Sequence, residues 1–507
     1  MKNILLILPL FLLFCCSIFG QVRPTGLIFD NQEYQKTPLQ PNFSGAKYDE
    51  VKLQVDLKKY CPIPGDQGEL ASGVGWATGY GLLTISRAIQ LDLTDRSEIT
   101  RKANSALFIY NQIKPQGTDG GASLHDAMQL LKDQGSCLSS SFDVNVGNSN
   151  ILPSADQKSQ AREFSIADYV ALFRSGAPDK VKIKKIQQSL SVDKPVVIGM
   201  KITSSFFSIS SNDQFWNPSN LELEDDSFDE GGHAMVVVGY QDGGYFEVMN
   251  SFGPTWGNKG FIKIKEAVFA QLCQYAFNIA LHKGNLNHTN IATNNQVATT
   301  YSPLTGTFEF KALAKDPSDA FLFKKDNLGN TLSDPYGNPF PEYYQPPIQL
   351  KQREGIYSFY NPIKSGTAFQ LIAREIPESK YIYVFSIDAN NNLSAHFPKK
   401  ETRVSSFIPD PMAELIIPSR SNILKIEKGK DDLIILFSNI EIKDYHERLE
   451  RINGFIGANT FEKMRHGFKD LLFDPSYINY QSNAMSFSTN PGSLGSIVPI
   501  ILSGEGR

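Results

Sequence analysis

Three short segments of this chain hold side chains of types that could do chemistry together. Gln67 lies in a glycine-rich turn, His233 begins an apolar run, and Asn250 follows the histidine by 17 positions. Histidine is the side chain whose charge changes most readily near neutral pH, so any reaction here would depend on proton transfer at His233. The elements around these residues must then bring three distant stretches of chain to one place.

Each segment also has an ordinary structural explanation. The stretch 66–77 can be a helix N-terminus capped by Ser72. A histidine at a strand start is more often a hydrogen-bonded edge residue than a catalyst. The stretch 250–261 can be a Gly-Pro hairpin with Trp256 as its apolar anchor. Taken one at a time, the segments decide nothing.

Taken together and in order, the segments resemble the papain-like family of cysteine peptidases, particularly its bacterial branch, in which a Gln-Gly turn leads to Ser-Cys-Val-Gly-Trp-Ala. The resemblance spans roughly residues 50–280, close to half of the chain. The matching positions are Gln67-Gly68, Ser72-Gly73-Val74-Gly75-Trp76-Ala77, Gly232-His233-Ala234, Asn250-Ser251 and Trp256-Gly257.

The resemblance implies a role for each matching residue. Gln67 corresponds to the amide that helps bind the oxyanion, His233 to the base, and Asn250 to the residue that orients the imidazole. Gly120 and Gly121 resemble the glycine pair that receives an extended substrate backbone. A further aromatic residue, Phe252, stands where the family has the tryptophan that shields the His–Asn pair.

The departure from the family lies at the nucleophile. Six residues after Gln67, where the family has its cysteine, this chain has Gly73, which has no side chain that could attack a carbonyl. Ser72 is the only nearby hydroxyl, but it is one position early, so in a helical turn it points about 100° away. We therefore expect an inactive homologue.

The elements that must position these residues follow the order of helices first and strands later, which predicts an α+β domain with a helical lobe and a β-sheet lobe. We expect helices over 73–90 and 123–132, and strands over 195–202, 234–240, 245–250 and 260–264. Four glycines in the first half of the first helix indicate close packing, and we expect the cleft to survive as a preformed groove.

The second half of the chain reads as a separate β-rich domain. A linker is predicted at 284–306, and 307–507 resembles an uncharacterised bacterial extracytoplasmic module, with a plain β-sandwich as the fold expected. A hairpin turn is expected at 388–393 because Asn tolerates the positive φ of tight turns. The predicted strands are 307–313, 367–374, 381–387, 393–397, 422–426, 433–437, 484–487 and 497–502, with one added helix over 443–472.

The N-terminus has the pattern of a secretory signal peptide over residues 1–20, followed by a leader over 21–50 that would lie extended across the domain at 51–283. We therefore expect export to the periplasm, the cell surface or the medium. Lipid anchoring at Cys15 or Cys16 is the alternative.

An exported chain meets oxidising conditions. Cys61 and Cys137 lie near family disulfide positions, and we expect them to pair, with three unpaired buried thiols, including Cys273, as the alternative.

Composition limits the kinds of partner that we expect for this chain. The formal charge is −4 and no Lys/Arg-rich block is long enough to follow a phosphate backbone, so nucleic acid is not expected. We find no metal-ligand cluster, phosphate-binding loop or cofactor fingerprint, and expect neither metal nor cofactor. The prediction is an exported, inactive peptidase homologue that binds a peptide or protein in its cleft, with no membrane span after signal removal. The alternatives are an active peptidase, of cysteine type or using Ser72, and a structural protein that assembles with other envelope proteins.

Overall fold

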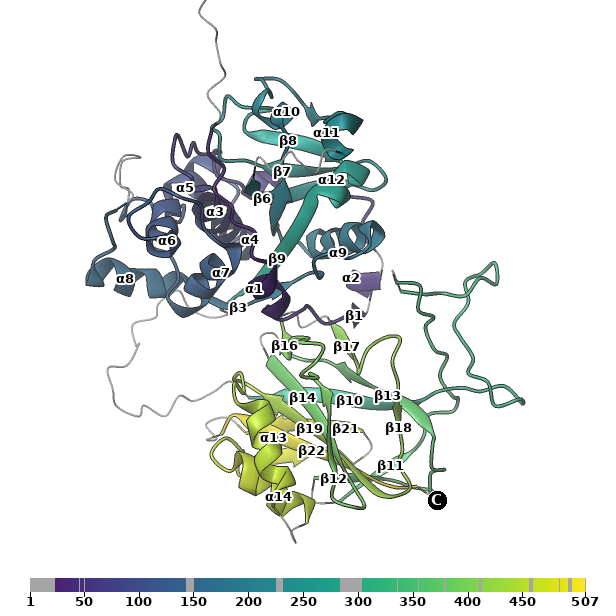
Figure 1. The fold of residues 1–507 in the computed structure, drawn as a ribbon. Helices are drawn as coiled ribbons and strands as arrows, with labels where there is room; N and C mark the ends of the chain where they lie inside the picture. Colours follow the sequence, from purple (N-terminus) through teal and green to yellow (C-terminus); the bar gives the residue numbers. More distant parts are fainter. Residues whose placement is uncertain are drawn as a thin grey trace, which may run out of the picture.

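The structure is a computed structural model, and it describes residues 23–506 apart from 45, 50, 143–149, 225–230, 283–302, 335, 354, 378–379, 410–412, 456–458, 483 and 491–494. Two domains follow one another along the chain, and Figure 1 shows them as two bodies joined at one side. We call residues 51–282 the N-terminal domain and residues 303–506 the C-terminal domain. The predicted signal peptide and nearly all of the predicted linker lie outside the described residues. Within the described residues, no helix is long and apolar enough to cross a membrane.

The helical half of the N-terminal domain surrounds one buried helical run that begins at Gly73 and confirms the helix predicted over 73–90. This run consists of α3 (Gly73–Gly75), the π-helical stretch η2 (Trp76–Leu83) and α4 (Thr84–Gln90). The second predicted helix is α7 (Leu124–Asp133). The other helices here are η1 (Lys58–Tyr60), α5 (Arg96–Arg101), α6 (Ala106–Ile113), α8 (Ala155–Ala161) and η3 (Arg162–Phe164).

Within its described residues, the sheet half holds eight strands in the order β3-β9-β4-β6-β7-β8-β5, with β2 paired to β6. The four predicted strands are β4 (Val196–Lys201), β6 (Gly232–Gln241), β7 (Tyr245–Met249) and β8 (Phe261–Lys265). The rest are β2 (Gln54–Asp56), β3 (Ile166–Ala171), β5 (Phe215–Trp216) and β9 (Cys273–Leu281). Helices α9 (Asp179–Ser191), α10 (Ser204–Phe207), α11 (Asn220–Glu224) and α12 (Glu266–Leu272) complete this half. The predicted α+β class is confirmed, and Cys273 begins the strand β9.

The C-terminal domain is a sandwich of two sheets. The first has the order β1-β17-β13-β10-β21-β20 with β18 on β13, and the second β11-β12-β22-β19-β14-β15 with β16 on β14. Its strands are β10 (Thr305–Ala312), β11 (Leu350–Arg353), β12 (Ile356–Phe359), β13 (Ala368–Arg374), β14 (Lys380–Asp388), β15 (Leu393–Phe397), β16 (Phe407–Ile408), β17 (Glu414–Ile417), β18 (Leu424–Lys425), β19 (Gly429–Ser438), β20 (Ile478–Tyr480), β21 (Met485–Thr489) and β22 (Ile497–Gly506), with a 3-10 turn η4 (Pro475–Tyr477).

Alternation along the strands explains both faces of the second sheet. Val384 and Ile435 point into the core between the sheets, whereas their neighbours Phe385 and Ile434 point to the outer face. Two helices, α13 (Tyr445–Asn453) and α14 (Thr460–Phe468), cover that outer face. The β-rich domain predicted from the sequence is therefore present.

The single helix predicted over 443–472 is wrong, because the chain forms two helices there. The first ends at Asn453 with Gly454 as its C-cap. Asn459 is the N-cap of the second, in a capping box in which its side chain accepts from the Glu462 backbone N–H. The predicted hairpin between β14 and β15 is confirmed. Asn391 has φ 65°, and the Asp388 carboxylate accepts hydrogen bonds from the backbone N–H groups of Asn390 and Asn392.

The leader contains short regular elements where only an extended chain was predicted. They are α1 (Asn31–Lys36), β1 (Phe43–Ser44) and α2 (Ala46–Asp49). In Figure 1 the dark purple leader passes between the helical half and the sheet half of the N-terminal domain and reaches the C-terminal domain at β1. The leader thus touches every large part of the molecule.

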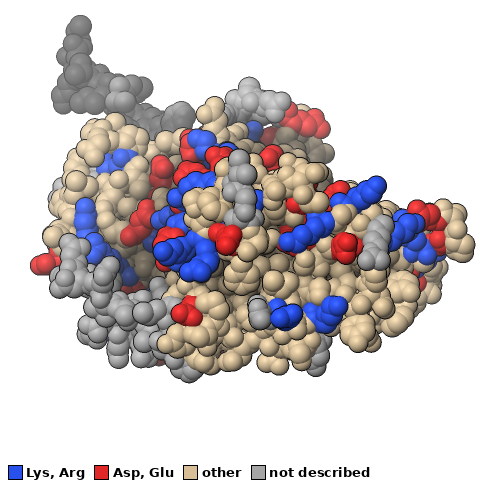
Figure 2. Space-filling model, turned by 90° about the horizontal axis from the view of Figure 1, so that it is seen from below, with Lys and Arg blue, Asp and Glu red and all other residues tan. Residues whose placement is uncertain are grey.

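Charges of both signs are interspersed on the surface. On the face drawn in Figure 2, Lys and Arg side chains alternate with Asp and Glu, and no broad area of one sign forms. This mixture agrees with the small net charge of −4.

Candidate functional site

The sheet brings His233 and Asn250 together. His233 lies near the start of β6, and Asn250 directly follows β7, which pairs with β6 in antiparallel register. The two side chains are buried, and His233 Nε2 lies 2.6 Å from Asn250 Oδ1. The same amide oxygen accepts from the Ser251 backbone N–H at 2.8 Å. The 17 positions between His233 and Asn250 thus correspond to the hairpin that β6 and β7 form.

Aromatic rings enclose the His–Asn pair. The Phe252 ring stacks on the His233 imidazole, with 5.1 Å between ring centroids and 25° between planes. Phe206 approaches the imidazole edge-on at 5.7 Å and also contacts Trp256. Phe252 therefore lies where a shielding aromatic was expected.

Burial determines the protonation of His233. Loss of hydration lowers its pKa to about 4, although the neighbouring acceptors Asn250 Oδ1 and the Thr25 carbonyl favour the protonated form. The imidazole is therefore neutral at pH 7. With its Nε2–H donated to Asn250 Oδ1, the neutral ring keeps a lone pair on Nδ1 and makes no hydrogen bond to the Thr25 carbonyl oxygen 3.4 Å away.

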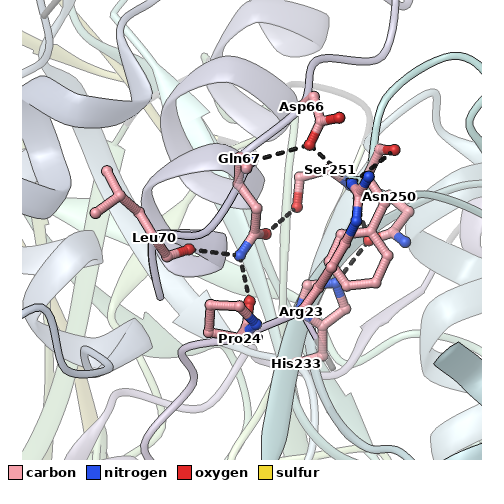
Figure 3. A network of polar contacts seen from close by, with 10 residues as sticks. Arg23, Pro24, Asp66, Gln67, Leu70, His233, Asn250 and Ser251 are labelled. Carbon is pink, nitrogen blue, oxygen red and sulfur yellow. Dashed lines mark hydrogen bonds and ion pairs between the residues drawn. The ribbon is translucent and has the colours of Figure 1, made fainter. Parts of the chain in front are cut away.

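Gln67 lies in the turn before the helical run that begins at Gly73, and its backbone N–H donates to the Ser251 carbonyl. Both the nitrogen and the oxygen of its side-chain amide form hydrogen bonds, as Figure 3 shows. The Nε2 group donates to the Pro24 carbonyl at 2.6 Å and to the Leu70 carbonyl at 2.9 Å, and Oε1 accepts from the Ser251 hydroxyl at 2.7 Å. The amide that the resemblance assigns to oxyanion binding holds a carbonyl oxygen of the leader.

Gly73 begins α3 at the point where the leader comes closest. A Cβ atom built on Gly73 would lie 2.3 Å from the Thr25 carbonyl oxygen and 3.2 Å from both Gln67 Oε1 and His233 Cε1. The Thr25 oxygen is also 3.4 Å from His233 Nδ1. A backbone carbonyl of the leader therefore lies where a nucleophilic side chain would begin.

Both walls of the cleft pair with the next leader residues. On the helical side, the Ala122 backbone N–H donates to the Gly26 carbonyl at 2.8 Å, and the Ile28 N–H donates to the Ala122 carbonyl at 3.0 Å. On the sheet side, the Leu27 N–H donates to the Gly232 carbonyl at 3.1 Å. The glycine pair predicted to receive a backbone lies beside these bonds, since a Cβ on Gly121 would be 2.8 Å from the Gly26 carbonyl oxygen. Gly120 instead accepts the Tyr110 hydroxyl.

The leader occupies the cleft tightly. Gly26 has φ +83°, and a Cβ there would lie 1.9 Å from the Ala71 carbonyl oxygen, so only glycine fits. Arg23 forms an ion pair with Asp66 at 2.9 Å and lies over the Phe252 ring at 5.5 Å. The groove expected from the sequence is therefore occupied at this point by the leader.

Ser72 is buried beside Gly73 but makes no contact that would activate it. It occupies the N-cap position of α3 as the sequence suggested, but its side chain makes no capping hydrogen bond, and its Oγ has no hydrogen-bond partner among the residues that the structure describes.

The predicted disulfide is absent, because Cys61, Cys137 and Cys273 are free and buried. Each sulfur has its own environment: the Cys61 thiol donates to the Leu57 carbonyl and the Cys273 thiol to the Tyr275 carbonyl. Burial raises the pKa of Cys137 and of Cys273 to about 12, so neither supplies a thiolate at neutral pH. The alternative of three unpaired thiols describes the structure.

The structure thus brings Gln67, Gly73, His233, Asn250 and Phe252 to one place, with Gly121 nearby. Sequence reasoning missed the leader residues Thr25 and Gly26, whose only signal is one glycine before the apolar Leu27-Ile28 in a segment otherwise rich in Pro, Asn and Gln. Among the described residues, no group of three His, Cys, Asp or Glu could hold a metal ion.

Comparison with known proteins finds a similarity over part of the N-terminal domain. Residues 108–281 match the family described as Papain family cysteine protease. This part of the chain is therefore similar to that family, and the matched span includes His233 and Asn250 but begins after Gln67 and Gly73.

Several solved structures are similar to the N-terminal half of the chain. Xylellain, a cysteine protease from Xylella fastidiosa, shares 21% identity over 52% of this chain and 99% of its own, with a TM-score of 0.42. The digestive procathepsin L 3 of Tenebrio molitor larval midgut shares 19% identity over 49% of this chain and 77% of its own, at 0.37. A Carica candamarcensis cysteine protease in complex with E-64 shares 16% identity over 46% and 100%, at 0.36. No curated protein matches the chain.

Proposed function

We propose that this chain is an exported papain-like peptidase homologue that does not hydrolyse peptides and whose cleft binds an extended peptide segment. In the free protein that segment is its own leader, residues 23–28. Export is supported by the signal-like N-terminus alone.

One observation carries the proposal: the Thr25 carbonyl oxygen lies 2.3 Å from where a Cβ of residue 73 would be. No side chain can occupy position 73 while the leader is in place. The absence of a nucleophile and the bound leader are therefore two aspects of the same arrangement.

The remaining groups of the site are suited to binding. Gln67 donates to a peptide carbonyl, and the backbone of Ala122 and Gly232 supplies the donors and acceptors that an extended peptide needs. Hydrolysis would further require a nucleophile facing His233. The Ser72 hydroxyl has no such partner among the described residues, and the three cysteines beyond the signal segment are buried elsewhere.

Hydrolysis of a mixed fluorogenic peptide library tests inactivity. We expect the wild-type protein to give no turnover, and Gly73→Cys to give slow turnover that a thiol-directed inhibitor abolishes, because its new side chain must first displace Thr25. Gly73→Ala is the matched control, since it displaces the leader equally but adds no thiol. Wild-type turnover that Ser72→Ala or His233→Ala removes would refute the proposal and indicate a working hydrolase.

A labelled peptide with the sequence of residues 23–29 tests peptide binding. Gly26→Ala should weaken the resident leader and so increase the affinity for the added peptide at least tenfold over wild type. Gly176→Ala is the control, because Gly176 has a similar φ of +80° but no atom within 4 Å of a Cβ built there. Adding Gln67→Ala to Gly26→Ala should then weaken binding several-fold, by the loss of one buried hydrogen bond. Equal affinity of the two glycine variants would argue against a peptide-binding cleft.

A further inference from the structure

The leader does not end at the cleft. After Ile28 it forms α1, whose Tyr34 is buried in the N-terminal domain. The Tyr34 hydroxyl donates to the Phe173 carbonyl at 2.7 Å, and its ring stacks on Tyr275 with 4.2 Å between centroids. This helix fixes the leader to strand β9 and to the segment that follows β3.

The next residues lie between the two domains. The Pro38 carbonyl accepts from the Ala171 N–H and the Gln40 N–H donates to the Ala171 carbonyl, both at 2.8 Å, at the edge strand β3 of the N-terminal sheet. Between these two bonds, the Leu39 N–H donates to the Arg403 carbonyl and the Leu39 carbonyl accepts from the Ser405 N–H, both at 2.8 Å. One short stretch of backbone therefore hydrogen-bonds to both domains at once.

The leader then becomes part of the C-terminal domain. Strand β1 pairs with β17, with Phe43 opposite Leu415, and forms one edge of the first sheet. Phe43 and Tyr48 are each 4% exposed and belong to the core between the sheets of the sandwich. Arg420 forms an ion pair with Asp49 at 2.5 Å. The C-terminal domain is thus completed by residues from the other end of the chain.

Contacts between the domains outside the leader are both apolar and polar, since Ala280 belongs to the same buried cluster as Tyr381 and Phe407. Lys132 binds Glu441 at 3.0 Å, and Arg174 donates to the carbonyls of Thr402 and Arg403 at 3.3 and 3.4 Å. Arg174 also donates to the Thr37 carbonyl of the leader at 2.7 Å. The buried Phe43 and the backbone bonds of Leu39 add the leader to this interface.

We propose that residues 23–44 form a permanent strap that couples the cleft to the domain interface, so that a peptide which displaces the strap from the cleft also loosens the two domains. The partner class of the cleft is an extended peptide with a glycine at the position of Gly26. This inference rests on the peptide-binding part of the proposed function but not on inactivity, because a working enzyme could carry the same strap.

Hydrogen exchange on the full-length mature protein tests the coupling. Gly26→Ala weakens the cleft end and Phe43→Ala the far end, while Gly176→Ala is the control. The cleft is reported by the amides of Leu27 and Ala122, and the junction by those of Leu39 and Ser405. We expect each end variant to increase exchange at least tenfold at both places, with the control unchanged.

An increase in exchange rate confined to the mutated end, or no increase at either place, would overturn the strap proposal. Amides of Val237 and Val248 in the central sheet serve as the reference for global destabilisation. Should Phe43→Ala raise exchange there, Phe43→Leu, which keeps most of the buried side chain, repeats the comparison. Peptidase activity is measured in a separate assay. The strap proposal can therefore be refuted while the proposal of an inactive cleft is upheld.

Intact mass of the exported protein gives a second readout. A permanent strap must remain attached, so the mature chain should begin at or before residue 23. A mature chain that begins after residue 44 would show a segment that is removed, and would overturn the inference.

Discussion

At the scale of single residues, the site depends on two glycines, which have no side chain. Gly73 and Gly26 allow two backbones to approach where any Cβ would collide with a carbonyl oxygen, at 2.3 and 1.9 Å respectively. His233 Nε2 and Asn250 Oδ1 lie 2.6 Å apart, and His233 Nδ1 faces the Thr25 carbonyl oxygen at 3.4 Å.

The buried imidazole of His233 should make the protein less stable in acid. Its pKa is about 4 in the fold against about 6.5 when unfolded, so the unfolded chain binds the proton first as the pH falls. The contribution is fully present above pH 6.5 and is lost as pH falls toward 4, by on the order of 3 kcal/mol. Urea unfolding at several pH values between 7.5 and 4.5 measures this loss of unfolding free energy.

His233→Gln should show a smaller loss of unfolding free energy over that range than wild type, while His466→Gln, at an exposed position on α14, should match wild type. Burial also lowers the pKa of His396 to about 4, so part of the wild-type slope remains in His233→Gln. Identical slopes in all three proteins would contradict this assignment.

At the scale of elements, the central helix is determined by packing and not by helix propensity. Gly75 and Gly79 would be poor choices for an isolated helix, but they allow this one to approach α6. Strand β3, at the sheet edge, likewise accepts the leader because its outer backbone groups need partners. In both cases two segments of backbone lie close together.

Replacing Gly75 should therefore destabilise the protein despite the gain in helix propensity. A Cβ there would lie 2.3 Å from the Ala106 carbonyl oxygen. Gly75→Ala gains about 1 kcal/mol of propensity but loses more by overpacking, so we expect a net loss of about 1–2 kcal/mol in urea unfolding. Gly454→Ala, where the nearest atoms lie at 3.8 Å, should change stability by less than about 0.5 kcal/mol. A Gly75→Ala variant more stable than wild type would refute the packing argument.

At the scale of the whole molecule, the N-terminal segment connects parts that are distant in sequence. Phe43 pairs its strand with residue 415, and Leu39 lies between Ala171 and Val404. The free, buried cysteines show that this assembly is held by packing and backbone hydrogen bonds, without a disulfide among the described residues. Cleft occupation and domain arrangement therefore depend on the same segment.

The sequence by itself predicted the α+β class of the first domain, and it placed His233, Asn250 and Gly73 in three motifs, because motif order and spacing are local properties of the chain. It also indicated the β-rich second domain and the hairpin at Asp388, where turn chemistry is encoded within five residues. It did not reveal that the same Asp-to-Asn turn recurs at Asp326–Asn330 and Asp334–Asn338. The split between α13 and α14 was missed although Gly454 and the capping pair Asn459 and Glu462 mark it.

Only the tertiary structure decided that the cleft is filled, that Cys61 and Cys137 do not pair, and that the leader completes the second domain. These facts depend on contacts between residues far apart in sequence, such as Thr25 with His233 and Phe43 with Leu415. A leader poor in periodic apolar residues gives no signal of its docking site, because its backbone makes most of the contacts and backbone is the same for every sequence.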